Sequence, residues 1–344
     1  MKHDSDVLIA GGGLNGPALA LALASAKLRV TVVDAQPLRA RADEGFDGRA
    51  YALAIASQRL LAAVGLWGGL APNAQPIRAV KASDGRAGES AAPFGLHFDA
   101  AELEGGPVGY MLEDRFLARA FADAIAANPQ ITMIAGTSVE AQDPDPAGVT
   151  VTLSTGQTLA ARVLVGADGR RSGVAERAGI SRTGWGYGQT ALVCALDHEL
   201  PHNGVAQQVF LPNGPLAILP LPGNRCSIVW SETDANARTL AALDDADFLA
   251  ILRPRFGEHL GAIALAGQRF SYPLNLTLAN AYTAPRVALV GDAAHGVHPI
   301  AGQGLNLGLR DVAVLAEVLV EAARRGEDIG AVDVLARYQG WRRF

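Results

Sequence analysis

The chain has 344 residues, of which 49% are hydrophobic and 18% are charged, and its formal net charge is −5. This length predicts about two domains with a sizeable core, and the composition excludes a disordered chain. The negative charge gives no general attraction to polyanions, so we predict no nucleic-acid partner.

Cysteine and histidine usage limits the classes of site that the chain can carry. Cys194 and Cys226 are too few for a disulfide framework and lack metal-binding spacing, so we expect two reduced core residues. The seven histidines form no HExxH or Cys/His cluster, and we predict no metal site. The N-terminus does not resemble a signal peptide, and the longest apolar run, residues 17–24, is shorter than a membrane span. We therefore expect a cytoplasmic protein.

The first motif follows a short apolar run at residues 7–10. A G-x-G-x-x-G pattern there opens an Ala/Leu-rich helix, and it consists of Gly11, Gly13 and Gly16 with Leu14 and Asn15 between the last two. Such glycines permit a tight turn, close approach of a pyrophosphate and helix–strand packing, and the helix N-terminus offers free N–H groups. Asp34 ends the next strand, where it can accept hydrogen bonds from an adenosine ribose. The pattern predicts a βαβ dinucleotide site.

The pattern of apolar and turn residues divides the rest of the chain into two kinds of segment. We predict helices over residues 60–68 and 114–129, and a hairpin around "STGQ" that leads into the buried strand "RVLVGADG". Residues 184–267 are typical of antiparallel strands, with one helix over 244–256, and "RVALVGDAAH" returns to the buried-strand pattern. We therefore predict a discontinuous nucleotide domain (1–75, 106–182 and 268–344) and a β-sheet substrate domain (76–105 and 183–267).

Two further motifs separate FAD from NAD. "RVLVGADGRRSGVAERAGI" places Asp168 and Gly169 after a strand, and "RVALVGDAAHGVHPIAGQGLNLGLRD" places Gly291 and Asp292 after another. With these motifs the sequence resembles the flavoprotein aromatic hydroxylases of the para-hydroxybenzoate hydroxylase type. Stretches such as "GRAYALAIASQRLLAAVGLW" and "GPLAILPLPGNRCSIVW" are most similar, within that group, to the ubiquinone-biosynthesis hydroxylases.

The resemblance covers nearly the whole chain and implies a fold and a cofactor. The fold would be α/β (α+β overall): a Rossmann-like FAD-binding domain of the para-hydroxybenzoate hydroxylase type with an inserted, mainly antiparallel β-sheet substrate domain. The cofactor would be FAD, with NAD(P)H as a transiently docking co-substrate and O2 as the oxidant. Reduced flavin would form a C4a-hydroperoxide that hydroxylates an aromatic ring.

The resemblance also assigns residues to parts of FAD. The ADP half would contact the first motif, Asp34 and the backbone of Val139. Arg49 would lie near the flavin and pyrophosphate, and Arg115 would be another cofactor contact. Asp168 would serve both FAD and the nicotinamide cofactor, and the ribityl and ring contacts would come from Gly291, Asp292, Pro299, Gly302, Gly304, Leu305 and Asn306.

Physical chemistry explains the glycines of the last motif. Glycines let the main chain lie against the flat flavin ring, and the following helix directs its positive N-terminus at the N1–C2=O edge. We assign no catalytic residue, because the flavin carries the chemistry; His298 and Pro299 are weak candidates. For His295 and His298 a structural role, bonding loop backbone, is favoured, and we expect Asp311 to bond the loop.

The resemblance implies a polyprenylated phenol of the ubiquinone pathway as substrate. Such a substrate would require peripheral contact with the inner membrane or with a quinone-biosynthesis complex, and a homo-oligomer is an open expectation. Two alternatives remain: hydroxylation of a soluble phenolic or other ring, and a non-hydroxylating FAD-binding assembly protein. Relatives usually continue for several dozen residues past "RYQGWRRF", so we expect a truncated form or a shortened member.

Overall fold

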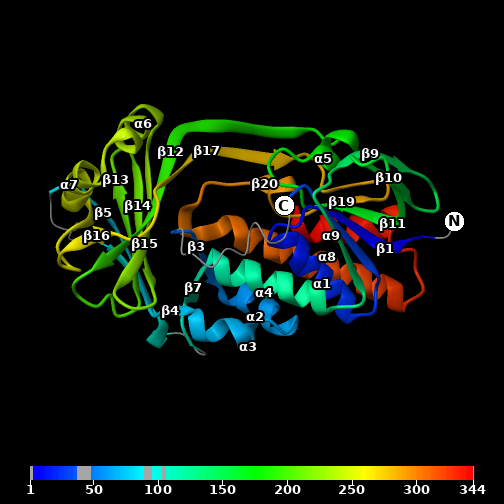
Figure 1. Cartoon of the computed structure of the whole chain (residues 1–344), viewed down its shortest axis with the longest axis horizontal. Coiled ribbons are helices and arrows are strands. Elements are labelled where there is room, and N and C mark those ends of the chain that lie inside the picture. Colours follow the sequence, from blue (N-terminus) through cyan, green and yellow to red (C-terminus); the bar gives the residue numbers. More distant parts are fainter. Residues whose placement is uncertain (1–2, 37–47, 89–94, 103–105, 344) are drawn as a thin grey trace.

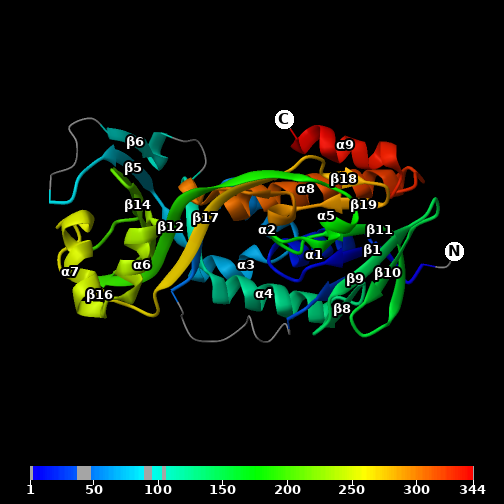
Figure 2. The ribbon, with the colours of Figure 1, turned by 90° about the horizontal axis from the view of Figure 1, so that it is seen from above.

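The computed structural model describes residues 3–36, 48–88, 95–102 and 106–343. In Figure 1 one sheet with its helices lies at the right and a second sheet lies at the left. The long strands β12 (Arg182–His198) and β17 (Phe270–Ala279) run between the two regions. The view from above, Figure 2, shows the same two strands as the bridge.

The first sheet has eight strands in the order β18–β19–β11–β1–β2–β8, with β10 and β9 branching from β11. All neighbours from β19 to β8 are parallel. Parallel strands covered on both faces favour continuous apolar runs, and Val7, Leu8 and Ile9 are fully buried. The strands are β1 (Ser5–Ala10), β2 (Val30–Asp34), β8 (Ile131–Ala135), β9 (Val139–Pro144), β10 (Val149–Leu153), β11 (Thr158–Gly166), β18 (Thr283–Ala284) and β19 (Val287–Leu289).

Helices pack on this sheet, and α1 (Asn15–Ser25) packs against α8 (Gln303–Arg324). One stripe of α8 faces the core: Leu309, Val312, Leu315 and Leu319 are buried and Leu305 is half-buried. The other elements here are α2 (Ile55–Ala63), α3 (Trp67–Leu70), α4 (Asp114–Ala127), α5 (Gly173–Arg177), α9 (Val332–Arg342) and the 3-10 turns η2 (Ala71–Asn73), η4 (Gly291–Ala293) and η5 (Ile300–Gly302).

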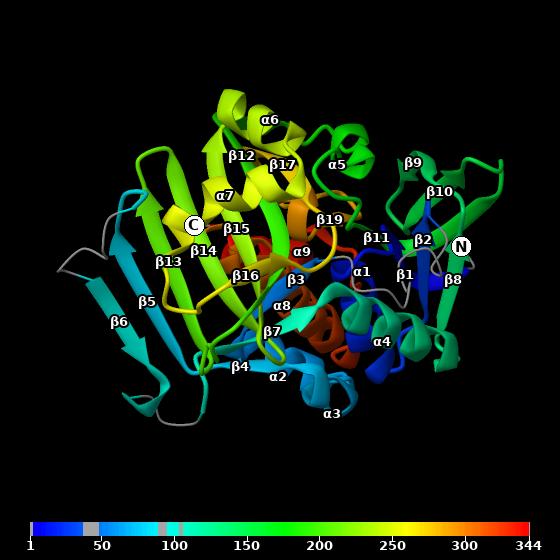
Figure 3. The same ribbon diagram turned by 60° about the vertical axis from the view of Figure 1, so that its left-hand side comes forward.

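The second sheet has nine strands in the order β20–β17–β12–β15–β14–β13–β5–β6, with β16 paired to β12. Figure 3 shows α6 (Asp234–Ala242) and α7 (Asp245–Phe256) over one face. Cys194 and Cys226 are buried free thiols on that side, as expected, and burial raises the pKa of Cys194 to about 12. The remaining strands are β5 (Ala79–Asp84), β6 (Gly95–Asp99), β13 (Val205–Leu211), β14 (Gly214–Leu221), β15 (Arg225–Thr233), β16 (Ile263–Leu265) and β20 (His295–Gly296); η3 (Ala100–Glu102) follows β6.

A small antiparallel sheet lies between the two larger ones. Its order is β3 (Ala50–Ala54), β7 (Gly109–Glu113) and β4 (Gln75–Ile77). Met111 of β7 is fully buried in one cluster with Ala195 and Leu221 of the nine-stranded sheet, and Leu112 belongs to the core of the eight-stranded sheet. β3 and β7 therefore tie the two regions together.

Two local predictions were wrong. The helix expected over residues 60–68 is α2, which begins at Ile55 and ends before Gly65, where φ is +82°. A helix was missed at α6, where the Thr233 hydroxyl accepts a hydrogen bond from the Asn236 N–H and caps the first turn. The expected hairpin is confirmed by the antiparallel pairing of β10 with β11.

The division into domains remains a proposal. β17 lies in the segment 268–344 but pairs with β12 in the nine-stranded sheet. Residues 37–47, 89–94 and 103–105, which belong to the predicted segments 1–75 and 76–105, lie outside the described residues.

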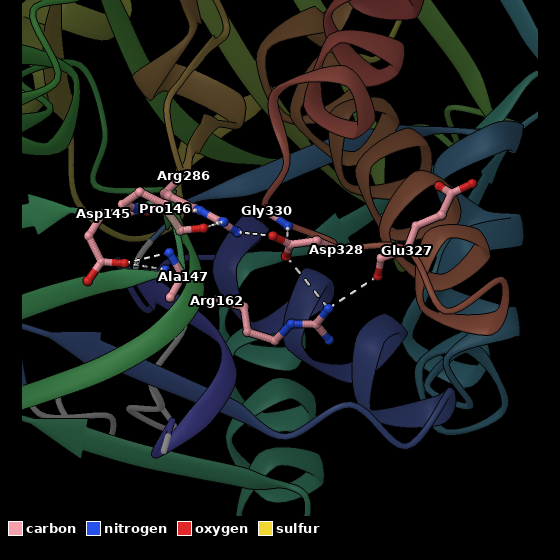
Figure 4. Close-up of polar contacts among 9 residues, drawn as sticks. Asp145, Pro146, Ala147, Arg162, Arg286, Glu327, Asp328 and Gly330 are labelled. Atoms are coloured by element: carbon pink, nitrogen blue, oxygen red, sulfur yellow. Dashed lines mark hydrogen bonds and ion pairs between the residues drawn. The ribbon is translucent and has the colours of Figure 1, made fainter. Parts of the chain in front are cut away.

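A network of charged side chains joins the amino end of β19 to the loop between α8 and α9 (Figure 4). The Arg286 guanidinium lies 2.6 Å from the Asp328 carboxylate and donates to the carbonyl oxygens of Asp145 and Pro146. Arg162 on β11 donates to the Glu327 carbonyl (3.2 Å) and lies 3.6 Å from Asp328. We call Arg162, Arg286, Asp328 and these carbonyls the Arg286 network; it joins the β9–β10 turn, β11 and the α8–α9 loop.

Candidate active site

All three sequence motifs meet at one edge of the parallel sheet. Gly11 follows β1, Asp168 follows β11 and Gly291 follows β19, and these strands are neighbours. Asp34 ends β2, on the other side of β1. Ligands of open α/β sheets bind outside the carboxyl ends of the strands. The arrangement therefore creates one site from four chain segments.

Glycine is required in the first motif by the fold itself. Gly11 has φ +111°, and a Cβ there would overlap the carbonyl oxygen of Ala167. A Cβ at Gly16 would overlap the Gly11 carbonyl oxygen. The turn, the helix start and β11 thus approach one another more closely than a side chain allows.

The buried carboxylate of Asp34 holds this turn. One oxygen accepts the N–H of Gly12 and the other accepts the N–H of Gln36 at 2.6 Å. Asp34 lines a cavity of about 470 Å³ with Gly13 and Val139. The predicted contacts of the ADP half are therefore brought together, although their roles remain predictions.

Asp168 lines the same cavity from the neighbouring strand. Its Oδ2 accepts the Val174 N–H at 3.1 Å, whereas its buried Oδ1 has no hydrogen-bond partner in the described part of the chain. A buried acceptor without a donor is costly. A ligand hydroxyl or amide in the cavity would remove that cost.

A second cavity of about 490 Å³ lies on the other side of Gly13, and the two cavities share Gly13 and Gln36. Leu14 and Arg49 line it, as does Asp114, whose carboxylate lies 3.4 Å from the Arg49 guanidinium. Asp114 also accepts the Tyr51 hydroxyl at 3.0 Å, and burial together with the Asp114 charge raises the pKa of Tyr51 far above its usual value. Arg49 is thus held beside the cavity by a buried acid.

The loop after β19 contacts both other motifs. Gly291 has φ +62°, and its Cα faces the side chain of Asn15 at the start of α1. Asp292 forms an ion pair of 3.1 Å with Arg170, which follows the Asp168–Gly169 motif. Asn15 and Gly291, both predicted cofactor residues, therefore also serve packing between segments.

The start of α8 is tied to β3. The Asn306 amide donates to the carbonyls of Ala52 and Gly302 and accepts from the Ala54 N–H and the Ser57 hydroxyl, all at 2.7–2.8 Å. We predicted a cofactor contact for Asn306, and this anchoring role of its side chain was missed.

Space is left beside the first turn of α8. Gly302 has φ +63° and packs on Ala52, whereas a Cβ at Gly304 would meet no atom of the described residues within 4 Å. The half-buried Leu305 follows. The helix N-terminus therefore has room for a flat group against its backbone.

His295 and Asp311 pair with each other. Asp311 is completely buried; its Oδ2 accepts the Gly291 N–H at 2.9 Å, as expected, and lies 2.6 Å from His295 Nε2. For His295 we expected backbone partners, and the structure corrects this, because the buried carboxylate is the stronger acceptor.

The two weak catalytic candidates lie next to each other before η5. His298 is half-buried, its ring contacts Tyr187 edge-on with centroids 5.3 Å apart, and burial lowers its pKa. Its Nδ1 has no hydrogen-bond partner within the described residues, so the expected bond to loop backbone is absent at that nitrogen. Pro299 caps η5.

Arg115 does not line either cavity as far as the described residues go; its Nε donates to Glu113 at 2.6 Å and its guanidinium lies over the Phe116 ring.

Sequence analysis missed several residues that line the cavities and lie in the same segments as predicted ones. They are Gln36, Tyr51, Asp114, Phe121, Thr137, Ser138, Arg171 and Arg177.

These features fit FAD. Two cavities share Gly13 and Gln36 at the turn before α1, which offers N–H groups suited to a pyrophosphate. One cavity is lined by Asp168, whose buried Oδ1 has no partner within the described residues, and Gly304 leaves space at the N-terminus of α8. Within the described residues, no helix combines the length and apolar character needed to cross a bilayer.

Comparison with known proteins agrees with this reading. The family model described as an FAD binding domain matches residues 4–343. The chain is 50% identical to the ubiquinone hydroxylase UbiL of Rhodospirillum rubrum, over 98% of this chain and 78% of the relative. It is 37% identical to the 3-demethoxyubiquinol 3-hydroxylase of Escherichia coli, over 98% and 85%.

A solved structure shares the fold. PqsL of Pseudomonas aeruginosa, described as a probable FAD-dependent monooxygenase, superposes with a TM-score of 0.81 at 27% identity, covering 99% of this chain and 92% of that one. The predicted fold class is thereby confirmed. The chain belongs to the FAD-binding family of aromatic monooxygenases that includes the ubiquinone hydroxylases.

Proposed function

We propose that the protein hydroxylates the aromatic ring of a polyprenylated phenol in ubiquinone biosynthesis, with NAD(P)H as electron donor. The observation that carries the proposal is the convergence of Gly11, Asp34, Asp168 and Gly291 at one edge of the parallel sheet. FAD, when bound, supplies hydride acceptance and dioxygen activation, so no protein nucleophile is needed.

The chain's own residues bind and orient. The turn from Gly11 to Gly16 would hold the pyrophosphate, and Arg49, fixed by Asp114, would neutralise its charge. The first turn of α8 would direct N–H groups at the pyrimidine edge of the ring, which favours negative charge there. His298, whose pKa is lowered by burial, stays neutral near pH 7 and is suited to accept or donate one hydrogen bond.

The prenylated tail implies contact with a lipid surface or with a complex that presents lipid. Exposed apolar side chains support this part of the proposal: Leu96 and Phe98 on β6 are 65% and 55% exposed, and Phe210 on β13 is 41% exposed. Such a protein would work peripherally at the membrane that holds the quinone pool, as a single chain or as a homo-oligomer.

Two measurements separate the candidate functions. Deleting the gene should cause one under-hydroxylated quinone intermediate to accumulate, and an unchanged quinone pool contradicts the proposal. In vitro, a short-chain prenylated phenol should stimulate NAD(P)H oxidation more than polar phenols do. Stimulation only by polar phenols favours a soluble substrate, and FAD binding without any stimulation favours the assembly protein.

Gly304→Leu tests the predicted flavin contact. Because a Cβ at Gly304 meets open space, the variant should fold normally yet lose bound FAD and its yellow colour. The matched control is Gly68→Leu, in α3, where a Cβ also meets no described atom within 4 Å. A normal flavin spectrum in purified Gly304→Leu contradicts the assignment.

A further inference from the structure

A buried carboxylate connects the loop after β19 to α9. Asp311 Oδ2 accepts the Gly291 N–H and faces His295 Nε2, and Asp311 Oδ1 accepts the Arg342 Nε–H at 2.7 Å. The Asp311 side chain is 0% exposed and that of Arg342 is 16% exposed. We call Gly291 N–H, His295, Asp311 and Arg342 the Asp311 network.

A second side chain of α9 holds the other end of the same segment. The Tyr338 hydroxyl donates to the Leu289 carbonyl at 2.6 Å, two residues before Gly291. Residues 338 and 342 are four apart, so they lie on one face of the helix. Burial, and next the Asp311 charge, raise the pKa of Tyr338 well above its ordinary value, so the hydroxyl remains a donor. α9 therefore holds Leu289 directly and reaches Gly291 and His295 through Asp311 of α8.

The electrostatics make Arg342 more than a packing residue. A buried carboxylate that loses its cation is left uncompensated, and it must reorient, take up a proton or admit water. Any of these changes the acceptor of the Gly291 N–H and shifts the backbone that carries Asp292. Asp292 in turn pairs with Arg170 after the Asp168 motif, so the shift reaches a second motif.

We propose that Arg342 and Asp311 are positioning residues which hold residues 291–295 in the geometry that binds the cofactor, and that the order of α9 is coupled to FAD binding. This proposal rests on the proposed function, because the role of Gly291 and Asp292 in FAD binding is part of it. Coupling of this kind is reciprocal: α9 strengthens FAD binding, and FAD stabilises α9.

The first test compares FAD dissociation constants of apoproteins by fluorescence titration. Arg342→Gln should bind FAD about tenfold more weakly than wild type. The matched control is Arg337→Gln, also in α9. Its guanidinium pairs at 2.7 Å with the carboxylate of Glu327, which precedes Asp328 of the Arg286 network. The control should keep the wild-type constant. Arg342→Lys keeps a cation beside Asp311 and should bind more tightly than Arg342→Gln.

Two results would overturn the proposal: equal dissociation constants for Arg342→Gln and Arg337→Gln, or equal loss in the Lys and Gln variants. If wild type itself binds no FAD, the proposed function fails rather than this inference. Should Arg342→Gln not fold, hydrogen exchange of wild type decides. FAD should slow amide exchange in α9 and leave α7 unchanged, whereas no slowing in α9 contradicts the coupling.

Discussion

The Asp311 network and the Arg286 network use the same chemistry in different places. Each pairs an arginine with an aspartate and joins α8 and α9 to the eight-stranded sheet. Asp311 is wholly buried and bonds the loop that carries Gly291, whereas the Asp328 side chain is 42% exposed and its partners include no predicted cofactor residue. Position relative to the strand ends, rather than ion-pair chemistry, decides whether such a network serves function or stability.

The largest difference is expected for removal of the buried acid. Asp311→Ala leaves Arg342 without its counter-charge and the Gly291 N–H without an acceptor, so the free energy of unfolding should fall by about 3–5 kcal/mol. FAD affinity should fall as well. Urea unfolding of the apoprotein measures the first effect and FAD titration the second. A loss below about 1 kcal/mol would show that the network is not stabilising.

Tyr338→Phe tests the second anchor of the same segment. The variant removes one buried hydrogen bond and leaves the Leu289 carbonyl with one partner fewer, which should cost about 1–2 kcal/mol. The charge pair of Asp311 and Arg342 stays intact. The FAD dissociation constant should therefore rise less than threefold over that of wild type. A tenfold loss of affinity would shift the main anchor from Arg342 to Tyr338.

Asp328→Asn is the counterpart in the Arg286 network. Solvent reaches Asp328, and Arg286 keeps its two carbonyl acceptors, so the loss of stability should be about 1 kcal/mol. The FAD dissociation constant should equal that of wild type. A loss of FAD affinity as large as that of Asp311→Ala would abolish the distinction between the two networks.

The smallest effect is an acid dependence at the β9–β10 turn. The backbone N–H groups of Ala147 and Gly148 lower the pKa of Asp145. A carboxyl whose pKa is lower in the folded chain stabilises the fold at neutral pH, and this contribution is lost as the pH falls through the folded pKa. Asp145→Asn should therefore flatten the decline of the thermal midpoint below about pH 4. An unchanged decline contradicts the assignment.

The sequence was most informative where local rules act on the backbone. The G-x-G-x-x-G spacing, the acid at the end of β2 and the two later strand–aspartate motifs placed the site, because the carboxyl ends of parallel strands must share an edge. Helical spacing of the apolar residues also accounts for the buried stripe of α8. In contrast, the start of α2 and the short helix α6 depended on capping and packing that periodicity does not encode.

Partners distant in sequence could not be predicted. Nothing in "GWRRF" indicates that Arg342 reaches Asp311, 31 residues earlier, because this contact depends on the path of the α8–α9 loop. The Asn306 amide bonds residues some 250 positions away for the same reason. Asp114 was missed as the partner of Arg49, although it directly precedes the predicted Arg115.

A crystal structure of the FAD complex tests the central claim most directly. The account predicts the adenosine in the cavity of Asp34 and Asp168, the pyrophosphate at the turn from Gly11 to Gly16, and the flavin ring against the backbone of residues 302–306. A complex in which the ring lies away from α8, or in which Gly291 and Asp292 are remote from FAD, would contradict it.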